Sequence, residues 1–148
     1  MLLVTFASCE EDVKFNTPAV QGLKDNELWK ATDYTATITG TTLTIEATNG
    51  FEALTLRTGQ VIPGAYQLGV NETNTAAFIL SADGIEMSYT TGTNRGSGQI
   101  IISDDERETD LTRGFISGTF RFDAVDEEGN VVNFQDGVFY KVPVTVIE

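Results

Sequence analysis

The sequence predicts an all-β fold on the strength of three features. Short runs alternate apolar with polar residues, as in the Thr-rich segment 34–48, and this period of two places one face of a strand in a core and the other in water. Asn49-Gly50 and Asp83-Gly84, dipeptides typical of type I′ hairpin turns, lie between such runs. No stretch keeps a helical period. We therefore expect sequential strands to pair as antiparallel hairpins.

The predicted strands follow one another along most of the chain. Their inward-facing residues are Tyr34, Ala36 and Ile38; Leu43, Ile45 and Ala47; Leu54 and Leu56; Phe78 and Leu80; Ile85, Met87 and Tyr89; Ile100 and Ile102; Ile116, Gly118, Phe120 and Phe122; and Val138, Tyr140 and Val142. About nine to eleven short strands with turns about every 8–12 residues are typical of an antiparallel β-sandwich. A flattened β-barrel is the alternative, because the pattern fits either closure.

The stretch before these strands is less regular. Between Val13 and Ala31, apolar residues are interrupted by Pro18, Gly22 and a charged run. This pattern predicts a strand, then a turn or one helical turn, then a second strand that begins near Trp29.

The composition excludes several classes of function. Among 148 residues, 22 are acidic and 9 are Lys or Arg, so the formal net charge of −13 repels the phosphates of nucleic acids. The chain has no His and one Cys, which removes His-dependent triads, nearly all zinc sites and intramolecular disulfides. We expect an acidic globular protein with no nucleic-acid partner, and no distinctive motif marks it as an enzyme.

The start of the chain resembles the end of a bacterial lipoprotein signal peptide. An apolar run at 2–6 and two small residues precede Cys9, the residue that becomes lipidated in such a signal. The run falls short of about 7–15 apolar residues, the length of a full signal, and no basic residue precedes it. We therefore interpret 1–8 as a truncated remnant. The alternative is a frayed terminus with one buried cysteine.

Lipidation of Cys9 would anchor the chain to a membrane, with 9–17 as a tether and 18–148 as a single β domain. Glu10, Glu11 and Asp12 follow directly, and such an acidic cluster resembles the surface-export signal of Bacteroidetes lipoproteins. We expect an outer-membrane lipoprotein of the cell envelope that is exposed at the surface.

Seven short sequence segments follow one another in a particular order over nearly the whole chain after Cys9. They are Val20-Gln21-Gly22, Leu28-Trp29-Lys30-Ala31, TLTIEAT, Pro63-Gly64-Ala65-Tyr66-Gln67-Leu68, SGQIIIS, ISGTFRFDA and Gly137-Val138-Phe139. Together with the lipidation motif, this order resembles an uncharacterised family of Bacteroidetes lipoproteins, catalogued as a domain of unknown function. The resemblance implies an all-β, lipid-anchored envelope protein, and it supplies no catalytic residue.

An acidic loop after a predicted strand is a candidate Ca²⁺ site. Asp104, Asp105, Glu106 and Asp110 offer carboxylates, and Ca²⁺ takes about 6–8 oxygen ligands. Arg107 within the cluster would repel the ion, and the spacing is not that of an EF-hand. The alternative is a solvated loop whose charges prevent a sheet edge from pairing with other chains. We expect no other cofactor.

Aromatic residues offer a second candidate site, a platform on which a sugar ring could stack. Tyr34, Tyr89 and Tyr140 fall in inward registers and are expected in the core. Trp29 is expected to plug one end of the sheets. Tyr66 follows a turn and is the least committed to the core, so Tyr66 and Trp29 are the candidate ligand-binding residues.

The predicted function is that of a non-catalytic binding or assembly module for glycan or another envelope protein. The alternative is a purely structural or accessory lipoprotein with no small-molecule ligand. The glycine-rich segment 92–98 is expected to be a long hairpin connection that rims a binding surface. An exposed aromatic cluster beside Tyr66 would favour glycan, whereas a long uncovered edge strand would favour a protein partner.

Overall fold

The computed structural model describes residues 19–147, which form eleven strands and contain no helix. In chain order the strands are β1 (Val20–Lys24), β2 (Glu27–Lys30), β3 (Asp33–Thr39), β4 (Thr42–Asn49), β5 (Glu52–Thr58), β6 (Gly64–Leu68), β7 (Thr75–Ala82), β8 (Ile85–Thr90), β9 (Ser97–Ile102), β10 (Phe115–Val125) and β11 (Val131–Ile147). The prediction of an all-β fold is confirmed, and the irregular stretch before residue 31 contains a hairpin of β1 and β2.

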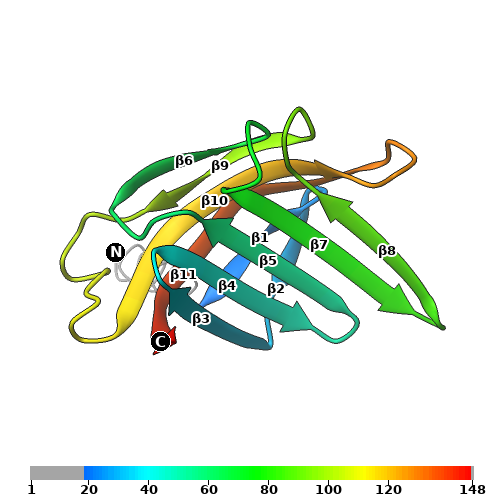
Figure 1. Cartoon of the computed structure of the whole chain (residues 1–148). Helices are drawn as coiled ribbons and strands as arrows, with labels where there is room; N and C mark the ends of the chain where they lie inside the picture. Colours follow the sequence, from blue (N-terminus) through cyan, green and yellow to red (C-terminus); the bar gives the residue numbers. More distant parts are fainter. Residues whose placement is uncertain (1–18, 148) are drawn as a thin grey trace, which may run out of the picture.

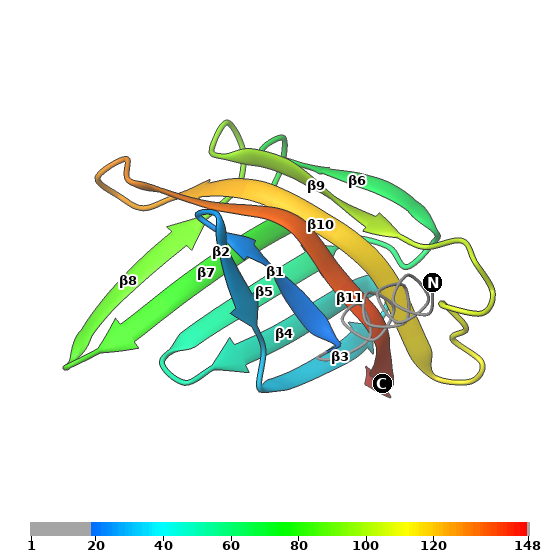
Figure 2. The same ribbon diagram turned by 180° about the vertical axis from the view of Figure 1, so that it is seen from behind.

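The strands form one mixed sheet that curls back on itself. Its order is β2-β1-β11-β3-β4-β5-β7-β8-β10-β9-β6, and β10 also pairs with β11. The strands from β11 through β3 and β8 to β10 therefore make a ring, whose two sides face each other as in a sandwich or a flattened barrel (Figure 1). The β1–β2 hairpin extends from β11 and lies in front in Figure 2.

One long strand, β11, joins the two sides of the ring. Its first part pairs antiparallel with β1 and β10, and its last part, from Val144 to Ile147, pairs parallel with β3. This parallel pair departs from the antiparallel pattern expected from hairpin turns. Such turns join only strands that are neighbours in sequence, whereas β3 and β11 lie at opposite ends of the chain.

The two predicted hairpin turns differ from each other. Asp83 and Gly84 both have positive φ (54° and 77°), as a type I′ turn requires. In the β4–β5 hairpin, Asn49 pairs with Glu52, so that the turn residues are Gly50 and Phe51, and of these two Gly50 alone has positive φ. That is the geometry of a type II′ turn, with glycine in first position, and the type I′ prediction is wrong there.

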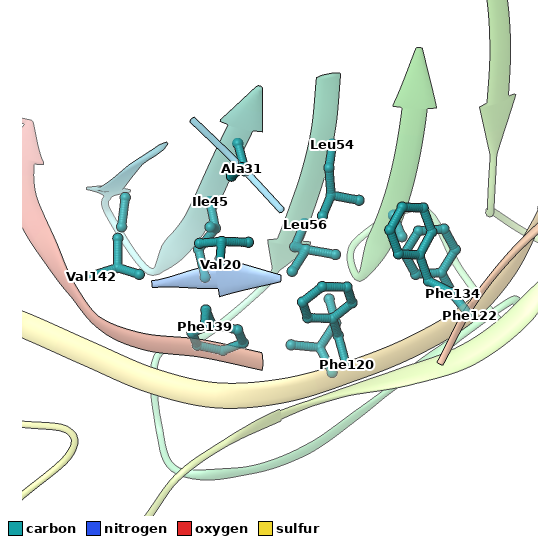
Figure 3. Close-up of a cluster of buried hydrophobic side chains, with 14 of the residues drawn as sticks. Val20, Ala31, Ile45, Leu54, Leu56, Phe120, Phe122, Phe134, Phe139 and Val142 are labelled. Carbon is teal, nitrogen blue, oxygen red and sulfur yellow. The ribbon is translucent and has the colours of Figure 1, made fainter. Parts of the chain in front are cut away.

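The core lies between the two sides of the ring and consists of aromatic and aliphatic side chains (Figure 3). The ring of Phe134 lies 5.0 Å from that of Phe122, 5.4 Å from that of Phe78 and 6.1 Å from that of Phe120, measured between centroids. These contacts join β7 on one side to β10 and β11 on the other. Burial of such large apolar rings is the main favourable contribution to folding.

The predicted register of β10 is confirmed for its phenylalanines. Ile116, Phe120 and Phe122 are buried, and Arg121 on the opposite face is exposed. A shift of one residue would exchange the two faces. The alternation therefore identified correctly which side of this strand meets the core.

Ser117 departs from the same alternation, which predicts that it faces water. It is buried because the loop at 103–114 folds onto this end of β10. The Ser117 amide donates to Thr109 Oγ1 at 3.0 Å, and its hydroxyl oxygen accepts from the Lys141 amide at 2.7 Å. Hydrogen bonds with distant segments thus replace water around this side chain.

The inward register predicted for the last strand is wrong at Val138 and Tyr140, whereas Val142 is buried as predicted. Phe139 is fully buried, whereas Val138 and Tyr140 are half-buried. Asp136 and Lys141 have positive φ (51° and 49°) at bulges where β11 holds one more residue than β10. Because each bulge moves the following side chains to the other face, alternation read straight through the strand goes out of phase.

Some inner-face residues are not covered. Tyr34 at the start of β3 is 36% exposed, and Ile85 and Met87 in β8 are 66% and 38% exposed, although the alternation predicts all three in the core. Tyr89, opposite Phe78, is half-buried against the core. The predicted face of β8 is correct, but the β7–β8 hairpin projects beyond the strands that face it (Figure 1).

Candidate functional site

One edge of β8 lies open in the wall of the ring. Along its whole length β8 pairs with β7, but on the other side a single pair, Thr90 with Val125, joins it to β10. From this pair the β7–β8 hairpin and the β10–β11 hairpin diverge in both views (Figures 1 and 2). Residues 85–89 therefore have a free edge within the part of the chain that the structure describes.

The hairpin geometry fixes which backbone groups this edge presents. The two-residue turn makes Ala82 and Ile85 a hydrogen-bonded pair, and such pairs alternate along an antiparallel ladder. Glu86 and Ser88 therefore direct their N–H and C=O groups away from β7. Consistently, the amide of Ser81, which lies opposite Glu86, points away from β8 and donates to the Phe51 carbonyl at 2.9 Å.

Two apolar side chains of β8 itself, Ile85 and Met87, are exposed beside the free edge, and we call these two residues the β8 patch. Phe51 in the β4–β5 turn is 73% exposed and lies across β7 from this edge, next to Ser81. A hollow of about 360 Å³ beside the patch is lined by Phe51 and by the hairpin tip at 81–86. Exposed apolar surface next to unpaired backbone is the arrangement to which an extended segment of another chain can add as a strand.

The two strands at the ends of the sheet order differ from β8. At β2, which has four residues, charged Glu27 and Lys30 are exposed while Trp29 between them is buried. At β6, Pro63 immediately precedes the strand and Gly64 begins it. Charge, proline and short length are the usual ways in which edges are kept from pairing. Within Ile85–Thr90 there is neither Lys, Arg nor Pro, and Glu86 is the one charged residue.

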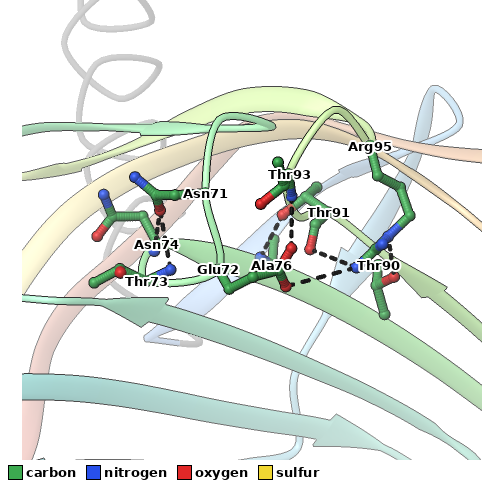
Figure 4. A network of polar contacts seen from close by, with 9 residues as sticks. All are labelled: Asn71, Glu72, Thr73, Asn74, Ala76, Thr90, Thr91, Thr93 and Arg95. Atoms are coloured by element: carbon green, nitrogen blue, oxygen red, sulfur yellow. Dashed lines mark hydrogen bonds and ion pairs between the residues drawn. The ribbon is translucent and has the colours of Figure 1, made fainter.

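A set of polar contacts holds the root of β8 (Figure 4), and we call it the clasp. Arg95 Nε donates to Thr90 Oγ1 at 2.9 Å, and the buried Thr91 Oγ1 accepts from the Ala76 amide at 2.9 Å. Arg95 Nη2 also lies 3.9 Å from Glu72 Oε1. These contacts fasten the end of β8 to β7 and to the loop that precedes β7.

Glu72 fastens the turn that follows β8. Its Oε2 accepts from the Thr93 amide at 2.6 Å. Hydrogen bonding to Thr93 holds the pKa of the Glu72 carboxyl below its ordinary value, and the charge of Arg95 makes a smaller contribution in the same direction. Asn71 orders the same loop by accepting from the amides of Thr73 (2.9 Å) and Asn74 (3.0 Å).

The clasp corrects the prediction for the glycine-rich segment 92–98. This segment is not a hairpin connection, because β10 lies between β8 and β9 in the sheet. The segment begins with a tight turn, in which Gly92 and Arg95 form a β-bridge. It then leads past β10 to the start of β9. The role of Glu72 in holding the turn at Thr93 could not be predicted from the sequence, because no local spacing relates two residues about 20 positions apart.

Comparison with known protein families assigns the chain to one of them. A family model described as "Domain of unknown function (DUF6252)" matches residues 16–143. The chain belongs to this family. No curated protein and no solved structure is detectably similar to it. The matched region includes the β8 patch and the clasp, and the predicted membership in a family of unknown function is confirmed.

Trp29 is a core residue of the DUF6252 domain. Its side chain is 4% exposed and meets Phe78 and Phe134 edge-on, with centroids 6.2 Å and 5.8 Å away. The indole Nε1–H donates to Glu52 Oε1 at 2.7 Å, which satisfies its one polar group. The surface that a sugar would need is therefore already packed between the strands.

Tyr66 lies far from Trp29 in the sheet, since β2 and β6 are at its two ends. Tyr66 is half-buried against the core, and its hydroxyl donates to the Ile62 carbonyl. Burial raises the pKa of the phenol, and the bond to Ile62 opposes that shift. The structure does not bring the two candidate ligand-binding residues together.

The acidic loop of the DUF6252 domain is tied down by its own contacts. Arg107 donates to both carboxylate oxygens of Asp105 at 3.1 and 3.0 Å, and Ser103 donates to Glu108 at 2.8 Å. Asp110 accepts from the Arg113 amide at 3.1 Å. Among residues 19–147, Asp104, Asp105, Glu106 and Asp110 belong to no group of three acidic, His or Cys residues arranged to hold a metal ion.

This loop also borders a groove of about 890 Å³ on the outer face of β9, β10 and β11. Ile101, Thr119 and Val138 lie side by side on its floor, because they pair across the three strands. Two aromatic residues line it: Phe139 is fully buried, and Tyr140 is half-buried with Lys141 Nζ 5.5 Å from its ring. The groove is broad and has no aromatic cluster.

The predicted anchor lies elsewhere in the chain. Cys9, Glu10, Glu11 and Asp12 fall outside the residues that the structure describes. Within 19–147, no helix has the length and apolar character needed to cross a membrane.

Proposed function

We propose that this DUF6252 protein is a lipid-anchored module of the cell envelope that binds another protein by adding a strand of the partner to β8. The observation that carries this proposal is the free edge of β8, with outward N–H and C=O groups at Glu86 and Ser88 beside exposed Ile85 and Met87. The clasp supports it, because a strand fixed at its root presents these groups in one geometry.

The proposed anchor is Cys9. An apolar run precedes it and Glu10, Glu11 and Asp12 follow it, the order expected for an outer-membrane lipoprotein exposed at the surface of a Bacteroidetes cell. Residues 9–17 would then be a tether between lipid and domain. Such a module binds partners within reach of the membrane while the β8 edge stays exposed to them.

A protein partner is favoured over a glycan by the positions of the aromatic residues. Trp29 is packed in the core, and Tyr66 is half-buried at the other end of the sheet order, so the two rings do not form a platform on which a sugar could stack. The outer groove contributes Tyr140 alone among aromatic side chains that could stack on a sugar there. An uncovered edge strand, in contrast, is the feature used for strand addition between proteins.

We propose a binding role for the chain, and the carboxyl groups whose pKa values shift have structural tasks. The pKa values of Glu72, Asp105 and Asp126 are all lowered, chiefly by hydrogen bonds from Thr93, Arg107 and Asn130. A carboxylic acid that donates a proton near neutral pH needs the opposite shift. These side chains act as acceptors that order turns.

Photo-crosslinking in whole cells tests the proposed function. A photoreactive amino acid at Ser88 should crosslink a distinct protein, and the crosslink should disappear when Met87→Lys is added. The matched control places the same group at Glu46, which is exposed on β4 between two paired neighbours. Equal products from both positions, or none from Ser88, would contradict strand docking and favour a purely accessory lipoprotein.

A further inference from the structure

We infer that the segment bound at β8 is an extended strand of alternating apolar and basic residues. This inference rests on the proposed function and adds the chemistry of the partner. It follows from the directions of the backbone groups, from the two faces of β8 and from the charges on both sides of the opening.

The two faces of β8 specify an alternating partner. Ile85 and Met87 lie on the inner face, and Glu86 and Ser88 lie on the outer face. A strand added to this edge places successive side chains alternately beside these two sets. Apolar partner residues would cover the β8 patch and extend the core, while the residues between them would lie beside Glu86.

The charges around the opening select basic residues for the outer positions. Asp83 and Glu86 lie on the β7–β8 hairpin, and Asp126, Glu127 and Glu128 lie on the turn that follows Val125 in the diverging β10–β11 hairpin. Two basic side chains in this region are already engaged: Arg95 with Thr90 and Glu72, and Lys24, which lies over Phe78, with Glu52. An opposite charge placed directly across a strand pair stabilises it, and a like charge destabilises it.

A second copy of the chain fits this edge less well. Pairing two β8 strands would bring together two bodies of net charge −13 and place their acidic hairpins side by side. It would offer no basic residue, since Ile85–Thr90 contains neither Lys nor Arg. We therefore commit to a cationic strand of a different protein.

Three capped peptides of equal length test this inference on the full chain, with alternating Val/Lys, Val/Thr and Val/Glu. Binding is followed by fluorescence anisotropy, and the bound site by amide hydrogen exchange. The Val/Lys peptide should slow exchange at Glu86 and Ser88, and its affinity should exceed that of Val/Thr by about tenfold, falling as salt is raised. Val/Glu should not bind.

Two matched charge reversals distinguish attraction of the peptide by Glu86 from attraction by the net charge of the protein. Glu86→Lys should remove most of the preference for Val/Lys over Val/Thr, whereas Glu46→Lys makes the same change in net charge on exposed β4 and should leave the preference unchanged. Ser88→Pro removes an outward N–H and should abolish binding. Ser88→Thr keeps that N–H and should bind as the original chain does.

The outcomes distinguish the inference from the function on which it rests. If Val/Thr protects Glu86 and Ser88 as well as Val/Lys does, strand docking stands and the cationic partner is rejected. If no peptide protects these two amides, both proposals fall. Concentration-dependent protection without peptide would show a second copy at this edge and would also overturn the inference. If Ser88→Pro does not fold by circular dichroism, the Glu86→Lys result decides.

Discussion

At the scale of single residues, a few side chains determine where strand alternation holds. Phe120 and Phe122 follow it because nothing interrupts β10 between them, whereas Asp136 and Lys141 break it in β11 by adopting positive φ. Lys141 is not a residue type that favours positive φ, so the sequence carries no sign of its bulge, whereas Asp136-Gly137 is a dipeptide of the same type as the Asp83-Gly84 turn. Ser117 is buried by a loop that the alternation does not describe.

The core register can be tested by two neighbouring substitutions. Phe120→Ala removes a buried ring that lies 6.1 Å from Phe134 and should lower the free energy of unfolding by about 3–5 kcal/mol. Arg121→Ala, on the exposed face, should change it by less than about 0.5 kcal/mol. Denaturant melts of both variants provide the measurement. Equal losses would mean that β10 faces the other way.

The clasp has a pH dependence that can be derived from Glu72. Its pKa in the folded chain lies below the ordinary 4.5, chiefly because of hydrogen bonding to Thr93 and to a smaller extent because of the charge of Arg95. A lowered pKa stabilises the folded state fully above about pH 4.5, and the contribution is lost as pH falls through the folded value. The Thr93 amide signal in NMR should therefore titrate with a midpoint below 4.5. A midpoint at or above 4.5, or an unchanged titration in Glu72→Gln, would contradict the contact.

At the scale of elements, the sequence predicts the two paired strands of the β7–β8 hairpin but not which of their side chains are covered by other strands. Alternation and the Asp83-Gly84 turn correctly indicate two paired strands, with Met87 and Tyr89 on the inner face. Which part of that face is covered depends on where β10 diverges from β8, a tertiary feature that no local pattern records. The lack of Lys, Arg and Pro in β8 is the one sequence signal of an open edge, and it is inconspicuous because Ile85, Met87 and Tyr89 also match a core register.

The free edge predicts that fast and slow amide exchange alternate from one residue to the next along β8 in the isolated protein. Amides of Met87 and Tyr89 bond to β7 and should exchange slowly, whereas those of Glu86 and Ser88 point outward and should exchange rapidly. Residue-resolved hydrogen exchange by NMR measures this directly. Uniform protection from 85 to 89 would mean that the edge is already paired.

At the scale of the whole molecule, closure of the ring could not be predicted from sequence. Local alternation and turns indicate six hairpin-type pairs between strands that follow one another. The ring, however, depends on β11 reaching β3 in parallel and on β10 touching β8 at Val125 and Thr90. Both pairs are long-range contacts, and the second is the weak point that leaves the proposed binding edge open.

The proposed attachment to the membrane concerns the whole molecule and depends on one atom, the Cys9 sulfur. With a complete upstream signal present, Cys9→Ala should abolish acyl-lipid labelling and move the protein from the membrane to the soluble fraction. Replacing Glu10, Glu11 and Asp12 by Ala should keep lipidation and reduce protease accessibility on whole cells. A Cys9→Ala protein that stays in the membrane fraction would refute the anchor.

The central claim, that β8 is paired by a partner strand in the envelope, is tested most directly by hydrogen-exchange mass spectrometry on the protein in isolated outer-membrane vesicles and after purification. A fragment covering 85–90 should exchange more slowly in the vesicles, whereas one covering 42–49, already paired on both edges, should exchange equally in both. Equal exchange of the 85–90 fragment in vesicles and in purified protein would contradict the claim.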